Sequence, residues 1–195
     1  MPDPAAPTCL EAEVQATDAA RAREGLGPLH LPARFGSLSP EEQLFVLADI
    51  ERVSRGEQPV LGLASALSLD AQRAAVAGND PRFRFSTVPS SSWWGSNWAT
   101  GVLNAADANY TWMYADGPGG FNVECPHGGA AGCWGHRANI LASPHGGTLI
   151  MGAGALTLPT GLSSVSELFV SVHSPRDIPP LTYTWAQAVA AGAGG

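Results

Sequence analysis

The stretch GHRANILASPHGGTLIMGAGALTLPTGLSSVSELFVSVH, residues 135–173, carries the signals that decide the fold of this sequence. Its beginning, His136–Leu141, is typical of a short helical turn. Two apolar segments follow, Thr148–Leu158 and Val165–His173, and Pro159-Thr160-Gly161 between them is a turn signal. The stretch therefore predicts a short helix followed by two strands joined by a turn.

Upstream of this stretch, the pattern of apolar residues predicts mostly helices. Ser39 can cap a helix, Pro40 suits its first position and Glu42 completes a capping box. Residues Phe83–Trp98 are rich in Ser and Trp and predict a strand plus a loop. Four helices are expected, over Cys9–Glu24, from Pro40 to near Gly56, over about Leu67–Ala77 and over Thr100–Asp116.

This order of elements predicts an α+β fold, with helices on both sides of a small, mainly antiparallel sheet in a three-layer α/β/α sandwich. The Pro/Ala-rich segment 1–8 is expected to be disordered. Residues 9–185 are expected to form one domain. The Ala/Gly-rich segment 186–195 is expected to be a tail or linker.

The charge of the chain argues against several partners. Ten basic and 17 acidic residues give a formal net charge of −7, and the basic residues form no run. Nucleic acid and anionic surfaces are therefore poor candidates. No apolar stretch reaches the roughly 18 residues that a membrane span needs. The first residues carry neither a basic nor an apolar region, so no signal peptide is predicted within this sequence.

Several motifs resemble the bacterial branch of the CAP superfamily, which comprises cysteine-rich secretory, antigen 5 and pathogenesis-related 1 proteins and is also called SCP-like. Gly135-His136-Arg137-Ala138-Asn139-Ile140-Leu141 is similar to that family's G-H-R-x-N-I-L. Met151-Gly152-Ala153-Gly154 lies where the family has M-G-x-G. The family's opening motif, N-x-x-R-x-x-x-G-L-x-P-L, is similar to a pattern near the start of this sequence, with Asp in place of Asn. The matching residues are Asp18, Arg21, Gly25, Leu26, Pro28 and Leu29. Gly95-Ser96-Asn97-Trp98-Ala99 corresponds to G-E-N-I-A, and Trp112-Met113-Tyr114 to W-Y-x-E.

The resemblance implies a central cleft lined by two His and two acidic residues, which in some members hold zinc or another divalent ion. In this sequence His136 matches the second His, whereas Ala74 takes the place of the first. Ser96 replaces the first Glu, and Asp116 is the candidate for the second. A catalytic zinc site usually needs three protein ligands, so no cofactor is predicted. Glu167 in the last strand is a further candidate partner for His136.

Cys125 and Cys133 are eight positions apart in a Gly-rich loop. In the extracellular setting that the resemblance implies, they are expected to form a disulfide that holds the loop in front of His136. A rival interpretation uses Cys125, His127, Cys133 and His136 as a zinc site, although its spacing is unlike that of common zinc motifs. Cys9 is the odd cysteine, and its partner is left open.

The tryptophans offer a possible ligand surface. Trp93 and Trp94 follow three serines, and the hypothesis is that they form an exposed stacking platform for sugar rings or lipid edges. The alternative is that they pack in the core, because Trp buries a large area in any fold. Together with His136, Ser96 and Asn97, they are the candidate ligand-binding residues.

These observations favour a secreted or cell-surface CAP-like domain that is a binding module rather than an enzyme, with cell-wall glycan, lipid or a protein as its partner. One alternative is a hydrolase that uses His136 with Asp116 or Glu167 as an acid/base pair, or Ser96 as a nucleophile. A second alternative is a structural module of a larger surface protein or assembly.

Overall fold

The computed structural model describes residues 7–120, 125, 127, 129–144 and 146–194, and most of the segment 1–8 that was expected to be disordered lies outside these residues. Five strands form one mixed sheet in the order β2-β4-β3-β1-β5. Their bounds are β1 Gly62–Ala64, β2 Ser91–Val102, β3 Thr148–Thr157, β4 Ser163–Val172 and β5 Leu181–Thr184. Only β1 and β3 pair in parallel among the described strands. The chain is thus an α+β fold whose mixed sheet is packed against helices.

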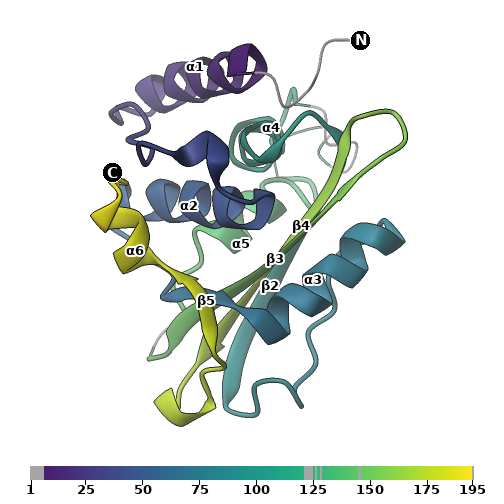
Figure 1. The fold of residues 1–195 in the computed structure, drawn as a ribbon. Helices are drawn as coiled ribbons and strands as arrows, with labels where there is room; N and C mark the ends of the chain where they lie inside the picture. Colours follow the sequence, from purple (N-terminus) through teal and green to yellow (C-terminus); the bar gives the residue numbers. More distant parts are fainter. Residues whose placement is uncertain (1–6, 121–124, 126, 128, 145, 195) are drawn as a thin grey trace.

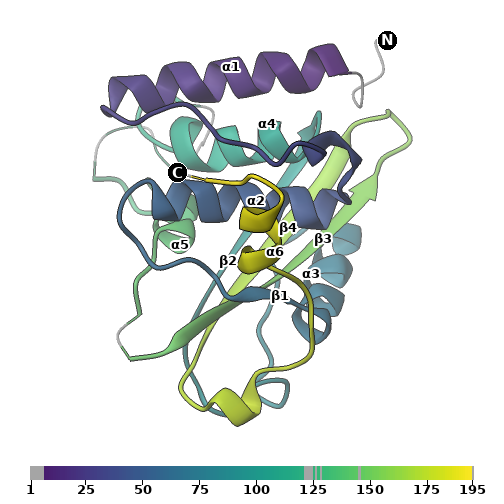
Figure 2. The ribbon, with the colours of Figure 1, turned by 60° about the vertical axis from the view of Figure 1, so that its left-hand side comes forward.

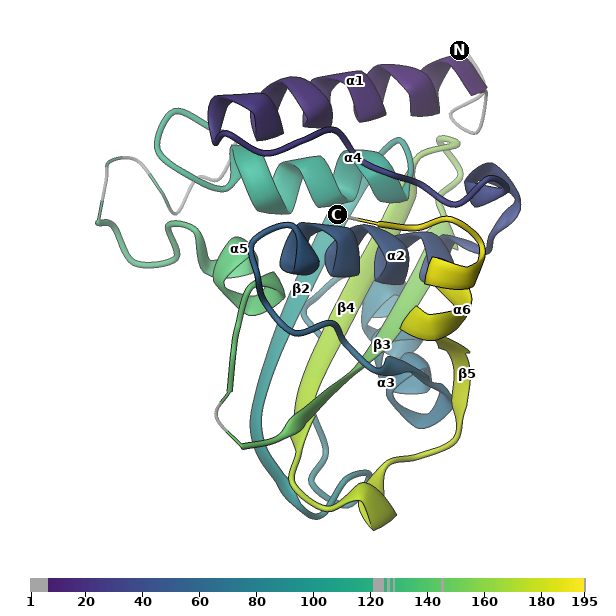
Figure 3. The ribbon, with the colours of Figure 1, turned by 90° about the vertical axis from the view of Figure 1, so that its left-hand side faces the viewer.

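Helices lie on both faces of this sheet (Figures 1 and 2). On one face, α3 packs along β3 and β4. On the other, α2 contacts β3, while α4 packs against both α2 and α1, and a short α5 reaches β2 (Figure 3). The helix bounds are α1 Pro7–Arg23, α2 Pro40–Val53, α3 Ser65–Ala77, α4 Ala105–Tyr110, α5 Gly135–Ile140 and α6 Trp185–Ala190. None of the described helices has the length and apolar character needed to cross a membrane.

The two faces of the sheet divide the core into two clusters. Leu149, Met151 and Phe169 face the larger cluster, which includes the buried residues of α2. Ile150 and Leu168 face the smaller cluster with α3. Successive residues of a strand point to opposite faces, so neighbouring positions of β3 and β4 serve different helices. This alternation also decides which site residues can meet.

Local signals account for the helices that were predicted correctly. The capping box of α2 is confirmed: the Ser39 hydroxyl accepts a hydrogen bond from the Glu42 N–H, and the Glu42 carboxylate accepts one from the Ser39 N–H. At the end of α3, Gly78 adopts the left-handed conformation with φ 70°, where a residue without Cβ is favoured. Strands β3 and β4 also agree closely with their predicted ranges.

Strands β1 and β5 have no predicted counterpart, and two predicted segments differ from expectation. The helix expected from Thr100 begins only at Ala105, because β2 continues to Val102 and Gly101 has φ 76°. The Asn104 side chain then caps α4 by accepting from two backbone N–H groups. The segment 186–195 was expected to be a tail or linker. Residues 185–190 instead form α6, which is capped by Thr184 and packs Ala188 into the core.

Candidate functional site

Asp116 fixes the start of α5. A π-helical turn, Thr111–Ala115, follows α4 and ends at this residue. One Asp116 carboxylate oxygen accepts a 3.0 Å hydrogen bond from the His136 N–H, and the other lies 3.2 Å from the His136 Nδ1. The Asp116 side chain is buried, whereas that of His136 is 33% exposed. The sequence candidates Asp116 and His136 are therefore brought together, and the imidazole is held at the surface by a buried carboxylate.

A chain of amide side chains connects α5 to the sheet. Asn139 donates to the Ser96 carbonyl oxygen at 2.8 Å and to the Asn97 side-chain oxygen at 2.9 Å. Asn97 in turn donates to the His136 carbonyl oxygen at 3.2 Å and to Glu167 at 3.3 Å. The side chains of Asn97, Asp116, His136, Asn139 and Glu167 are called the polar cluster below. Most of its hydrogen-bonding capacity is used internally.

Glu167 is the most perturbed member of the polar cluster. Its side chain is completely buried, and one carboxyl oxygen has no hydrogen-bond partner among the described residues. Burial raises the pKa of Glu167 to about 8, and the hydrogen bond from Asn97 offsets only part of this effect. Glu167 is therefore protonated and neutral at pH 7.

The raised pKa predicts a pH dependence of stability. Between about pH 4.5, where an ordinary Glu ionises, and about pH 8, the folded chain holds a proton on Glu167 that the unfolded chain has released. The free energy of unfolding therefore falls as the pH rises through this window. Glu167→Gln should remove this contribution. The variant should therefore gain stability over the parent at pH 8 compared with pH 5, by on the order of a few kcal/mol. Urea unfolding of the parent and of Glu167→Gln at pH 5 and pH 8 measures this difference. Equal effects of the substitution at both pH values would contradict the assignment.

The remaining candidates of β2 are divided between the faces of the sheet. Ser96 and Trp98 share the face of α3, where the Trp98 indole donates to Ser164. The Ser96 side chain thus lies across the sheet from His136, which separates the proposed nucleophile from its base. Trp93 packs against the larger core cluster, whereas Trp94 lies 6.3 Å from the Phe83 ring and is 41% exposed. Because consecutive residues face opposite ways, Trp93 and Trp94 form no continuous platform.

The structure also locates the position expected for a first metal-binding His. Ala74 lies on α3, on the face of the sheet opposite to the polar cluster. A histidine at position 74 would therefore not share a metal with His136. Among the described residues, no group of three or more His, Cys, Asp or Glu side chains lies close enough to hold a metal ion.

The disulfide between Cys125 and Cys133 is present. Because both sulfurs are bonded to each other, neither is a thiolate that could bind zinc, and the rival four-residue zinc site is excluded. Cys133 directly precedes Trp134, the residue at the start of α5. The crosslink therefore ties the Gly-rich loop to the helix that carries His136. Cys9 is not part of a disulfide.

A groove of about 440 Å³ lies beside the polar cluster. Its walls are formed by Glu24, Trp134, Arg137, Ala138 and Leu141. The Trp134 side chain is 38% exposed, and its backbone has φ 60°, a strained conformation for a residue with a side chain. Its indole occupies the space that a Cβ at position 117 would need, which explains the glycine there. The groove thus has a large aromatic surface held in a fixed position.

Arg137 supports this groove with stacked and charged contacts. Its guanidinium lies 5.5 Å from the Trp134 ring and 5.7 Å from the Tyr114 ring, within range of cation–π attraction. It also forms a two-pronged ion pair with Glu24, at 2.7 and 2.8 Å. The Glu24 carboxylate receives a further bond from Arg55, and these partners lower the pKa of Glu24 to about 2.

This groove was not predicted from the sequence. Arg137 was noted only as a residue of the motif Gly135–Leu141, and Trp134 stands directly before that motif. Comparison of the sequence with known protein families and with curated proteins finds no match.

Proposed function

We propose that this chain is a CAP-like domain of the bacterial branch that acts at the cell surface or outside the cell, as a non-enzymatic module that binds cell-wall glycan. The observation that carries the proposal is the groove in which the exposed Trp134 indole lies beside Arg137 and Glu24, next to the half-exposed His136. An aromatic face flanked by planar hydrogen-bonding groups suits a sugar ring, which has apolar faces and a polar edge.

The contacts of the motif residues support the proposed family. Asp18 accepts a 2.7 Å hydrogen bond from the Leu29 N–H, and Arg21 donates to the Gly27 carbonyl oxygen at 2.8 Å. The opening motif therefore folds the chain back after α1. In the second motif, Arg137 and Asn139 join α5 to its neighbours. The placement of α3 on one side of the sheet and the other helices opposite also agrees with a three-layer α/β/α sandwich.

The hydrogen bonds within the polar cluster support the proposal that the domain is not an enzyme. Asn97, Asn139 and Glu167 are engaged with one another and with the backbone, so they fix α5 rather than face a ligand. Ser96 points away from His136. The disulfide supports an oxidising location, because such bonds persist outside the reducing cytosol.

Co-sedimentation with purified cell-wall sacculi tests this function. The parent protein should pellet saturably, and Trp134→Ala should weaken binding by about tenfold, equivalent to ~1.4 kcal/mol. Trp94→Ala is the matched control, because Trp94 is similarly exposed but lies on the other face of the sheet. If Trp94→Ala abolished pelleting and Trp134→Ala did not, the binding site would lie at β2 instead of the groove. Absence of pelleting by the parent would exclude the glycan and leave lipid or protein as the partner.

The alternative of a hydrolase has one specific observation in its favour. The 3.2 Å contact between His136 and Asp116 orients a partly exposed imidazole, as an acid/base pair requires. Glu167 does not share this geometry, because it is buried beneath Asn97. Loss of a measured activity in His136→Ala, with the fold retained, would support this alternative.

A further inference from the structure

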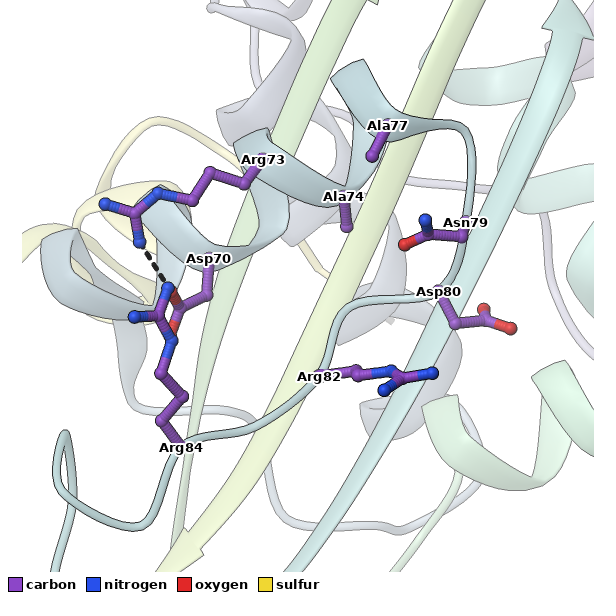
Figure 4. Close-up of a pocket in the computed structure, with 8 residues that line it drawn as sticks. All are labelled: Asp70, Arg73, Ala74, Ala77, Asn79, Asp80, Arg82 and Arg84. Carbon is purple, nitrogen blue, oxygen red and sulfur yellow. Dashed lines mark hydrogen bonds and ion pairs between the residues drawn. The ribbon is translucent and has the colours of Figure 1, made fainter.

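A second cavity, of about 240 Å³, lies between α3 and the segment 79–84 (Figure 4). It is on the face of the sheet opposite to the polar cluster, so it is independent of the glycan groove. Ala74 and Ala77 of α3 lie between its two sides. Arg73 and Arg84 lie beside Asp70 on one side, and Arg82 extends on the other (Figure 4).

The charge at this cavity contrasts with that of the whole chain. The protein has a net charge of −7 and only ten basic residues, all of them arginines. Three of the ten line this one cavity, together with the two acidic residues Asp70 and Asp80. Folding therefore gathers three positive charges although the basic residues form no run in the sequence, and it leaves the cavity with one excess positive charge.

Asp70 holds two of the arginines in place. A single carboxylate oxygen, Oδ1, accepts from Arg73 Nη1 at 2.9 Å and from Arg84 Nη2 at 2.7 Å. The Asp70 side chain is 6% exposed, whereas those of Arg73 and Arg84 are 62% and 56% exposed. The buried Asp70 carboxylate thus holds both guanidinium groups, whose further N–H donors face solvent. Within the described part of the chain, the Arg82 guanidinium forms no ion pair.

Aromatic side chains alternate with the arginines in the segment after α3. Phe85, the residue after Arg84, is 62% exposed, and its ring lies 5.1 Å from that of Phe83. Trp94 contacts the same Phe83 ring.

We propose that this cavity binds a phosphodiester group. Guanidinium groups recognise phosphate oxygens through paired N–H donors. A tetrahedral phosphodiester presents oxygens to donors on both sides of the cavity, to Arg73 and Arg84 on one side and to Arg82 on the other. A planar carboxylate presents its two oxygens in one direction, so it fits donors on two sides less well. The single negative charge of a diester also balances the one excess positive charge.

Amide chemical-shift titration of the folded protein with dimethyl phosphate tests this site. Shifts should be saturable and confined to residues 70–85. Arg73→Gln/Arg84→Gln should weaken binding by about tenfold or more. Arg82→Gln, which breaks no ion pair with a described residue, should weaken binding as well. Arg34→Gln is the control of equal charge, because Arg34 is an exposed arginine in the connection before α2, and it should change binding by less than about twofold.

Several results would overturn the proposal. These are shifts that do not saturate, equal losses in Arg34→Gln and Arg82→Gln, or equal binding of acetate and dimethyl phosphate. Flotation with phosphatidylglycerol vesicles then separates the sources of the phosphodiester. Flotation that the Arg73→Gln/Arg84→Gln variant loses identifies a lipid headgroup. Binding of dimethyl phosphate without flotation identifies a soluble or polymeric diester.

Discussion

Replacing Glu51 by alanine should lower the free energy of unfolding by about 3–5 kcal/mol. Glu51 is completely buried in α2 and forms a 2.8 Å ion pair with Arg21 of α1, whose side chain is also buried. The same carboxylate accepts from Arg55 and from the Tyr114 hydroxyl. Removing it leaves the Arg21 charge without its partner in the interior, which costs more than the loss of an exposed pair.

Glu11→Ala provides the control for this prediction, since Glu11 is exposed on α1 and its removal should change stability by less than about 0.5 kcal/mol. Urea unfolding followed by circular dichroism measures both variants. A change below about 1 kcal/mol in Glu51→Ala would mean that Arg21 finds another partner or reaches solvent. The buried ion pair between Arg21 of α1 and Glu51 of α2 would then be incorrect.

The effect of Glu51 should extend to the groove lined by Trp134 and Arg137. Arg55 contacts both Glu51 and Glu24, and Glu24 pairs with Arg137. The groove residues are therefore connected to the buried ion pair through one arginine. The opening motif and the GHRANIL motif, which are far apart in sequence, meet through these contacts.

Gly152→Val should be the second strongly destabilising substitution, with a cost of about 3 kcal/mol or more. Gly152 lies on β3 under α3, and a Cβ there would meet the backbone of Leu67 and Ser68. Backbone cannot move aside as the tip of a side chain can, so α3 would have to leave the sheet. Gly154 has the same relation to Gln72, which explains why two glycines alternate along this strand.

Gly27→Ala is the matched control for this prediction, because no atom lies within 4 Å of a Cβ built there. Its stability should stay within about 0.5 kcal/mol of the parent. Thermal unfolding of the two variants checks the contrast. If Gly152→Val unfolded at the parent temperature, the close approach of α3 to β3 would be refuted.

Local signals were sufficient for much of the fold. The capping box at Ser39, the glycine after α3 and the apolar runs of β3 and β4 act within a few residues of chain, and all four elements are where the sequence predicts them. The helix expected from Thr100 was wrong in its start, because a strand pairing with β4 extends β2 past this point. Packing of Ala188 likewise overrides the low complexity of the last segment.

The candidate site was predicted only in part, because its chemistry depends on which residues the tertiary fold brings together. His136 and Asp116 meet, as the resemblance implied, but Ser96 is turned away by the alternation of β2. Trp94 is separated from Trp93 for the same reason. The cavity of Arg73, Arg82 and Arg84 could not be foreseen, since it forms only when the segment after α3 folds back beside that helix.

The proposed function requires that this domain bind the cell wall without cleaving it. Incubating the protein with radiolabelled sacculi, and counting protein in the pellet and label in the supernatant, tests both halves of the claim at once. We predict saturable pelleting that Trp134→Ala weakens, with released label equal to that of a protein-free blank. Release of label that grows with time and disappears in His136→Ala would contradict the claim and identify a hydrolase.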